Sequence, residues 1–261
     1  MSVILDALAA ARGSGEGGDA VVAELRAARV RDAGGYLDDG PGVDRRRGPL
    51  LISQRVIAAF EEDTRVEPYR QLRTRLLQTM HDNRWNSVAI TSAHEGAGKT
   101  LTAVNLALSI ARDYNHTVLL ADLDLRAPTV HEKLGLDVRY GLVDYLRGAC
   151  ELDEAIVNSG FARLAVLPGR ALNRFSSELL ASPRMKRFMD GVVGRYDPAR
   201  VTIFDLPPLL RNDDALLFAP QAQCVLLVVE DGVTTEEQLD HSLSLLRKAN
   251  VVGTLLNKAR D

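Results

Sequence analysis

SVAITSAHEGAGKT, residues 87–100, is the stretch that decides the fold of this chain. An apolar run leads into a glycine-containing loop, and the Gly-Lys-Thr triplet at residues 98–100 opens the helical pattern LTAVNLALSIA. Strand, loop and helix form the context in which this triplet indicates a phosphate-binding P-loop. Ala93 stands five positions before the triplet, where the consensus has glycine. For this stretch alone, a purely structural tight turn is therefore the alternative.

The loop residues have the chemistry that a bound phosphate requires. Gly96 and Gly98 let the backbone turn its N–H groups around an anion, and the helix N-terminus adds a partial positive charge. Lys99 is long enough to reach the β- and γ-phosphates of a nucleotide, and the Thr100 hydroxyl is a suitable Mg²⁺ ligand. Asn257, at the end of the last predicted strand, is placed to contact a base. The predicted nucleotide-binding residues are Glu95, Gly96, Ala97, Gly98, Lys99, Thr100, Leu101 and Asn257.

A second apolar run, residues 117–120, continues into A-D-L-D-L-R, which contains Asp122, Asp124 and Arg126. Carboxylates at strand ends lie in the crevice where open α/β sheets bind ligands. The alternation of an extended chain puts Asp122 and Asp124 on the same face, so both can converge on one site. Arg126 is a candidate to neutralise charge on a transferred phosphate. The alternative, an acidic turn that caps the next helix, explains one aspartate better than two.

Apolar runs alternate with helical patterns along the rest of the chain. One of them, residues 201–205, closes with Asp205, and a hydrophobic strand closed by aspartate is typical of the Walker B motif. Such a carboxylate holds Mg²⁺ directly or through water, which adds Asp205 to Thr100 and Asp122 as predicted metal ligands. The alternation predicts an α/β fold, the doubly wound and mostly parallel sheet of a P-loop NTPase.

The sequence before the P-loop is organised differently. The T-R-V-E run that starts at Thr64 has the form of a capping box and predicts a helix that ends near residue 82. Glu67, Arg70 and Arg73 are three residues apart and lie along one face of that helix, where an exposed, ion-paired surface is the simplest interpretation. The predicted organisation is a short N-terminal helix (residues 1–12), a flexible arm (residues 13–63) and a P-loop ATP-binding domain (residues 64–261).

Composition excludes several classes of protein. The net charge of −3 over 261 residues is unlike the strongly basic footprint of a nucleic-acid-binding protein, so no nucleic-acid partner is expected. No apolar run has the length that spans a bilayer, and the start of the chain lacks the pattern of a signal peptide. Cys150 and Cys224 fit no metal or redox spacing, which predicts buried, reduced thiols and a cytoplasmic location.

The motifs together resemble those of the bacterial tyrosine kinases (BY-kinases) of capsule and exopolysaccharide systems, in particular the free-standing kind associated with exosortase-type loci. The resemblance covers residues 64–261. It is carried by EGAGKT with LTAVNLALSIA, by LLADLDLRAP (the second, acidic Walker motif of the family), by IFDLPPLL (Walker B), and by SSELLASPRM and VVGTLLNKA.

The resemblance implies a protein-tyrosine autokinase that uses ATP and Mg²⁺ and regulates polysaccharide polymerisation and export. Lys99 and Thr100 would act on the phosphates and the metal, with Asp122 as the candidate base and Asp124, Arg126 and Asp205 around it. The E-x-x-R-x-x-R motif of Glu67, Arg70 and Arg73 implies a ring-shaped homo-oligomer. The implied partner is the cytoplasmic tail of a membrane polysaccharide co-polymerase (chain-length regulator), which would recruit the protein to the inner membrane.

The chain departs from the family pattern in its tyrosines. Family members usually end in a tyrosine-rich tail that is phosphorylated in trans, whereas the last of six tyrosines here is Tyr196. Tyr36, in the predicted arm, is expected to be the most accessible acceptor. The six candidates are Tyr36, Tyr69, Tyr114, Tyr140, Tyr145 and Tyr196.

The P-loop itself has two departures. Glu95 stands where the family usually has proline, so its carboxylate should repel bound phosphates unless it points away or pairs with a cation. His94 occupies the position where partition and division-site ATPases carry a signature lysine, which argues against those relatives.

Two alternatives to the autokinase stay open. A catalytically silent, ATP-binding regulatory subunit of the polysaccharide machine is favoured by the missing tail and opposed by the intact set of Lys99, Asp122, Asp124 and Asp205. A partition-type ATPase that positions cargo is opposed by His94, and DNA-stimulated hydrolysis would revive it.

Overall fold

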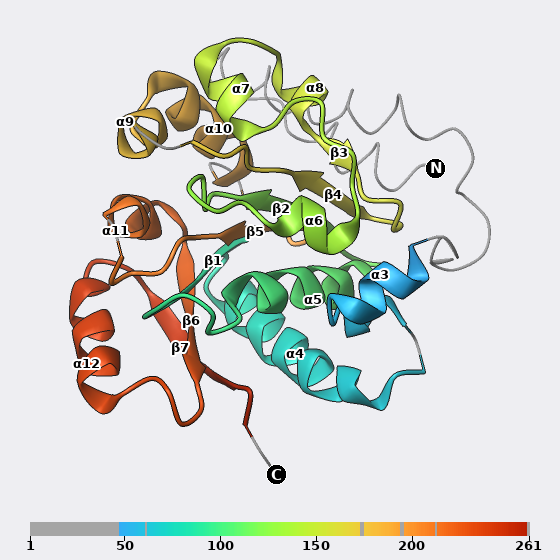
Figure 1. The fold of residues 1–261 in the computed structure, drawn as a ribbon, viewed down its shortest axis with the longest axis vertical. Coiled ribbons are helices and arrows are strands. Elements are labelled where there is room, and N and C mark those ends of the chain that lie inside the picture. The colour runs from blue at the N-terminus through green and yellow to red at the C-terminus, as the bar shows by residue number, and fades with distance from the viewer. Residues whose placement is uncertain (1–46, 61, 173–174, 194–195, 212, 260–261) are drawn as a thin grey trace.

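A seven-stranded sheet lies at the centre of the computed structural model, which describes residues 47–259 apart from 61, 173–174, 194–195 and 212 (Figure 1). Its strands lie in the order β3-β4-β2-β5-β1-β6-β7. All neighbouring strands are parallel except β3 and β4. The strands are β1 (Ser87–Ser92), β2 (Thr117–Asp122), β3 (Val157–Asn158), β4 (Leu164–Leu167), β5 (Arg200–Asp205), β6 (Cys224–Glu230) and β7 (Val251–Asn257). The predicted α/β fold with a mostly parallel sheet is confirmed.

The central strands are apolar on both faces because helices cover both faces. Every residue of β1 and β2 is buried. Val88 and Ile90 belong to one hydrophobic core, while Ala89 between them belongs to the other. This alternation across two cores is why a doubly wound sheet has strands that read as continuous apolar runs.

The helices divide between the two faces. The first core packs against α3 (Gly48–Ser53), η1 (Ile57–Ala59), α4 (Glu67–Asp82), α5 (Lys99–Ala111) and α6 (Val130–Leu134). The second packs against α7 (Leu142–Arg147), α8 (Leu152–Ala155), α9 (Ser176–Leu180), α10 (Pro183–Val193), α11 (Asp214–Phe218), η3 (Ala219–Gln221) and α12 (Glu236–Leu245). Figure 1 shows α4 and α5 side by side, with α5 nearer the sheet.

The segment before α4 differs from the predicted arm. Residues 48–60 form α3 and η1, and Leu51, Val56 and Ala58 are fully buried. Asn105 of α5 links the two segments, because its side-chain oxygen accepts a hydrogen bond of 2.8 Å from the backbone N–H of Ala58. For this stretch the interpretation as a flexible arm is wrong, while the predicted helix at residues 1–12 and the arm up to residue 46 lie outside the described residues.

The start of α4 also differs from the prediction. Thr64 lies in a 3-10 turn, η2 (Thr64–Val66), and α4 follows from Glu67 with no side-chain cap. Asp63 caps the turn instead, since its carboxylate accepts a hydrogen bond of 3.0 Å from the backbone N–H of Arg65. The predicted capping box is therefore wrong, although the end of the helix at Asp82 is correct.

Among the described residues, the structure contains no helix with the length and apolar character needed to cross a membrane.

Candidate functional site

The loop between β1 and α5 has a backbone that only glycine fits. Gly96 and Gly98 have φ angles of 81° and 97°, in the left-handed region that side chains rarely adopt. A Cβ atom at Gly98 would lie 2.0 Å from the Asn257 Nδ2 atom. That same Nδ2 atom donates a hydrogen bond of 2.8 Å to the carbonyl oxygen of Ala97. The end of β7 thus holds the loop from the side, while the contact of Asn257 with a base stays a prediction.

The predicted acidic residues meet the predicted lysine at the carboxyl edge of the sheet. Asp122 ends β2 and Asp205 ends β5, and the two are directly paired in the parallel register. The Lys99 ammonium lies 2.8 Å from Asp124 Oδ2 and 3.7 Å from Asp205 Oδ1. Lys99 Nζ also donates a hydrogen bond of 3.2 Å to the Thr100 hydroxyl. Five side chains that the sequence analysis selected from three separate motifs therefore form one cluster.

The cluster is buried, and this sets its electrostatics. Burial and repulsion from Asp205 raise the pKa of Asp122 well above its usual value. Burial also raises the pKa of Asp205, although the nearby Lys99 opposes the shift. Burial alone would lower the pKa of Lys99, but attraction to Asp205 and Asp124 outweighs it and raises that pKa. The site therefore concentrates negative charge around one cation.

Two of the carboxylates are held by backbone N–H groups. Asp122 accepts hydrogen bonds of 3.2 Å from Asp124 N–H and of 3.0 Å from Val130 N–H. Asp124 accepts one of 3.2 Å from Ala127 N–H. These bonds fix the loop that joins β2 to α6 against the end of the strand.

Asp205 is different and provides the test of whether a metal fits. Both of its carboxylate oxygens are buried and have no hydrogen-bond partner among the described residues. Lys99, 3.7 Å from Oδ1, offsets part of its charge, but a buried carboxylate without close hydrogen bonds stays costly unless a second cation or its water ligands satisfy it. No group of three acidic, His or Cys side chains suited to hold a metal by themselves occurs in the described chain. The residues therefore fit Mg²⁺, which commonly takes one or two protein oxygens and completes its coordination with phosphate and water.

Arg126 is held by residues that the sequence analysis did not select. Its Nε atom lies 3.3 Å from Asp214 Oδ2. Asp214 is buried at the start of α11 and accepts hydrogen bonds of 2.7 Å from the hydroxyls of Ser176 and Ser177 at the start of α9. The S-S-E-L-L and D-D-A-L-L runs contain these residues, but nothing in their spacing shows that they meet at Arg126.

Glu95 is exposed at the loop and pairs with Arg211, which follows β5. The predicted repulsion between Glu95 and bound phosphate therefore has a compensating cation. Arg211 was not selected from the sequence, because the pairing depends on how two distant loops pack.

His94 connects the same loop to the segment between β6 and α12. Its Nδ1 atom lies 2.8 Å from the Glu95 carbonyl oxygen, and its Nε2 atom lies 2.9 Å from the Thr234 hydroxyl. The Thr234 oxygen in turn accepts a hydrogen bond of 2.9 Å from the backbone N–H of Glu230 at the end of β6. His94 thus has a structural role at the loop.

The E-x-x-R-x-x-R residues lie on α4. Glu67 and Arg70 form an exposed ion pair of 3.6 Å. Arg73 instead points toward α5, where its Nη1 atom donates a hydrogen bond of 3.1 Å to the Ser109 carbonyl oxygen. The three residues therefore do not form one solvated row.

This fold and this lysine-centred loop define the class of P-loop ATPase domains. The AAA-domain family profile matches residues 86–244, which is more than half of the chain. The tyrosine-protein kinase YwqD of Bacillus subtilis is 35% identical over 216 residues, 82% of this chain and 90% of that protein. The tyrosine-protein kinase Etk of Escherichia coli is 32% identical over 197 residues.

The chain belongs to the family of bacterial tyrosine-protein kinases. The solved kinase domain of Escherichia coli Etk matches it with a TM-score of 0.71 at 31% identity, covering 76% of this chain and 77% of that one. The chain spans most of YwqD but only 27% of the full length of Etk. The resemblance to the bacterial tyrosine kinases inferred from the motifs is confirmed.

Proposed function

We propose that this protein is an ATP-dependent protein-tyrosine kinase that phosphorylates copies of itself and regulates polysaccharide polymerisation and export. The observation that carries the proposal is the buried cluster of Lys99, Asp122, Asp124 and Asp205 at the mouth of the P-loop. Buried charges of this kind are costly to the fold. A protein that only binds partners has no physical need for buried charges, whereas a protein that transfers a phosphate needs them to bind and polarise it.

Each residue of the cluster has a proposed role. The backbone of residues 95–98, Lys99, Thr100 and Leu101 would hold the phosphates, and Asn257 would contact the base. Thr100, Asp122 and Asp205 would hold Mg²⁺, which neutralises charge on the transferred phosphate when bound. Lys99 would exchange its contacts with Asp124 and Asp205 for contacts with the phosphates.

The remaining roles concern the proton and the developing charge. The raised pKa of Asp122 suits a carboxylate that accepts a proton from a phenol. Arg126, held at the rim by Asp214, would stabilise the developing negative charge on the transferred phosphate.

The polysaccharide setting rests on the family resemblance. The proposed partner is the cytoplasmic tail of a membrane polysaccharide co-polymerase, which would bring a cytoplasmic protein to the inner membrane. A homo-oligomer through Glu67, Arg70 and Arg73 is part of the same proposal, and no nucleic acid is expected to bind.

The test is mass spectrometry of the intact protein and its peptides after incubation with ATP and Mg²⁺, alone and with a peptide of the partner's cytoplasmic tail. We expect phosphotyrosine that disappears in Lys99→Met and persists in the matched control Lys186→Met, since Lys186 is exposed and pairs only with Asp190 among the described residues. Circular dichroism must show that Lys99→Met folds, because the change leaves Asp124 and Asp205 without their cation.

Two other results would change the assignment. Bound nucleotide without phosphate transfer, even with the partner peptide, would favour the catalytically silent regulatory subunit. Hydrolysis stimulated by DNA would instead favour a partition-type ATPase.

A further inference from the structure

Tyr114 is the most exposed of the tyrosines that the structure describes. Its side chain is 84% exposed, whereas Tyr145 is 3% exposed and its hydroxyl faces the Arg184 carbonyl oxygen. Tyr69, Tyr140 and Tyr196 are half-buried. A tyrosine must enter another protein's site to receive a phosphate, so an exposed side chain is the first requirement for an acceptor.

We infer that Tyr114 is an acceptor of phosphate in this protein and that a second copy of the chain phosphorylates it. The inference rests on the proposed kinase function and names its substrate. It differs from the expectation from sequence, which ranked Tyr36 as the most accessible tyrosine; Tyr36 lies outside the described residues.

The position of Tyr114 excludes transfer from the P-loop of its own chain. Lys99 begins α5 and Tyr114 follows the end of the same helix. A helix of 13 residues is about 20 Å long, which separates the two by far more than a side chain spans. Tyr114 lies just before Thr117, at the amino edge of the sheet, while Asp122 and Asp205 lie at the carboxyl edge. The acceptor and the site therefore face opposite ends of the molecule, and only another copy can join them.

The turn that carries Tyr114 is locally ordered. Asp113 accepts a hydrogen bond of 3.0 Å from the backbone N–H of Asn115, and its carboxylate lies 3.0 Å from the His116 ring. These contacts close the turn on either side of the tyrosine. The ring is thus presented outward from a turn of defined shape, which lowers the entropy lost when it enters a partner's site.

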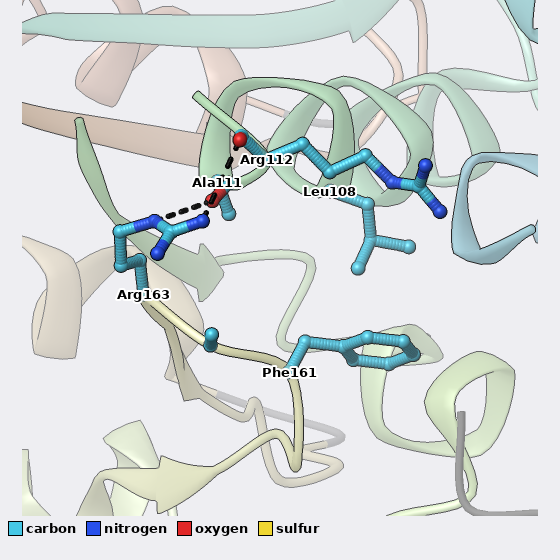
Figure 2. A pocket seen from close by; sticks show the side chains of 6 residues that line it. Leu108, Ala111, Arg112, Phe161 and Arg163 are labelled. Carbon is cyan, nitrogen blue, oxygen red and sulfur yellow. Dashed lines mark hydrogen bonds between the residues drawn. The ribbon is translucent and has the colours of Figure 1, made fainter. Parts of the chain in front are cut away.

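A cation lies against the tyrosine ring. The Arg163 guanidinium carbon is 4.7 Å from the centre of the Tyr114 ring. Arg163 is itself anchored, because its Nε and Nη2 atoms donate hydrogen bonds of 2.9 Å and 3.5 Å to the carbonyl oxygens of Ala111 and Arg112 (Figure 2). A phosphate gains from a nearby guanidinium through charge-assisted hydrogen bonds. The same arrangement would offset the unfavourable field that an anion meets at the C-terminal end of α5.

The reaction moves the γ-phosphoryl group of ATP to the hydroxyl of Tyr114. The phenolic oxygen of Tyr114 forms a bond to the γ-phosphorus of ATP in the second copy, and the bond from that phosphorus to the bridging oxygen breaks. ADP leaves with that electron pair. The phenolic proton passes to a carboxylate of the second copy's site, for which Asp122 is the proposed base, and from there to water.

The experiment mixes two distinguishable copies. The acceptor is a ¹⁵N-labelled Lys99→Met chain, which cannot transfer phosphate but keeps Tyr114. The donor is an unlabelled Tyr114→Phe chain, which keeps the P-loop. After incubation with ATP and Mg²⁺, we expect phosphotyrosine at Tyr114 of the labelled acceptor. The donor has no tyrosine at this position, so the signal must come from transfer between copies. Asp122→Asn serves as a second inactive acceptor if Lys99→Met does not fold.

The controls separate this inference from the proposed function. A labelled acceptor with both Lys99→Met and Tyr114→Phe should lose most of its phosphotyrosine, whereas one with Lys99→Met and Tyr140→Phe should not. The Tyr114→Phe donor should phosphorylate a synthetic Glu/Tyr copolymer as the unmodified protein does.

Each other outcome has a distinct meaning. Phosphotyrosine on the acceptor at Tyr36 or another position, with none at Tyr114, would overturn the inference and leave the kinase assignment standing. No phosphate on the acceptor or the copolymer, with the partner peptide present, would remove the proposed function and the inference with it.

Discussion

Asp205 carries a cost that the fold alone does not explain. It is fully buried, its two carboxylate oxygens have no hydrogen-bond partner within 3.5 Å among the described residues, and burial raises its pKa even though Lys99 lies 3.7 Å away. The ionised form is therefore less favourable in the folded chain than in the unfolded one. Such strain at one side chain is expected where function and stability conflict.

Replacing Asp205 with asparagine should stabilise the protein near neutral pH. A carboxyl group with a raised pKa destabilises the fold only where it is ionised, so the penalty is absent below the usual value of 3.8 and complete above the raised pKa. The melting temperature of Asp205→Asn minus that of the unmodified protein should rise as the pH increases from 3.8 through the raised pKa, and then level off. In a chain of this size, each gain of about 1 kcal/mol in the free energy of unfolding raises the melting temperature by roughly 2–4 °C.

Asp137→Asn is the matched control, since Asp137 is exposed and its removal should leave the melting temperature nearly unchanged. Asp205→Asn should also lose Mg²⁺-dependent nucleotide binding. A melting-temperature difference that stays flat with pH would contradict the assigned strain.

The residues of the candidate cluster were predictable because their chemistry is tied to local patterns. Lys99 follows a glycine loop, and Asp122 and Asp205 close apolar strands whose carboxyl ends must share one edge of a parallel sheet. Asp214 and Arg211 were not predictable. Their partners, Arg126 and Glu95, are about a hundred residues away in the chain, and packing rather than local pattern decides such pairs.

At the scale of elements, the P-loop is joined to loops on two sides. Glu95 pairs with Arg211 after β5, while His94 contacts Thr234 before α12. Both links leave from neighbouring residues of one loop. The shape of the phosphate-binding loop is therefore coupled to the two strands that flank β1.

Removing Arg211 should weaken nucleotide binding through Glu95. With Arg211→Ala, the Glu95 carboxylate faces the phosphates without its cation. Exposed pairs contribute about 0.2–1 kcal/mol, so we expect the Kd for ATP, measured by calorimetry, to rise by a few-fold. The double variant Glu95→Ala, Arg211→Ala should recover most of the affinity, because the repelling charge is gone.

The control compares Arg211→Ala with the double variant Glu95→Ala, Arg211→Ala. If the double variant binds as weakly as Arg211→Ala alone, then Arg211 contacts the nucleotide directly and the pair has no compensating role.

Periodicity predicted the central strands and the end of α4, and the largest region that it misplaced has a physical reason. Residues 48–60 fall within the predicted arm because they follow a stretch rich in Gly, Asp and Arg, yet three of their apolar side chains are buried on the face of the sheet that α5 and α6 cover. In this region tertiary contact overrides local preference.

At the scale of the whole molecule, the proposed contact with another copy concerns the exposed part of α4. Glu67 and Arg70 are exposed, whereas Arg73 is tied to Ser109. A test of self-association should therefore leave Arg73 in place, because its removal would also loosen α4 from α5.

We expect the double variant Glu67→Ala, Arg70→Ala to associate about tenfold more weakly, since a close charge pair across an interface can contribute about 1.5 kcal/mol. Analytical ultracentrifugation over a concentration series measures this. Arg75→Ala is the control, because Arg75 is exposed on a different face of α4. The same sedimenting species in all three proteins would show that this surface is only solvated.

The strand order also decides when, during folding, the site can form. β1 lies between β5 and β6, and Ser87 pairs with Thr202, more than a hundred residues later in the chain. Contacts this distant make folding slow, because a long loop must close before they add stability. On the ribosome, the apolar strand that leads into the P-loop is made early and must wait with both edges unpaired. Nucleotide binding is then one of the last properties the chain acquires, and the period before it is when β1 is most open to aggregation.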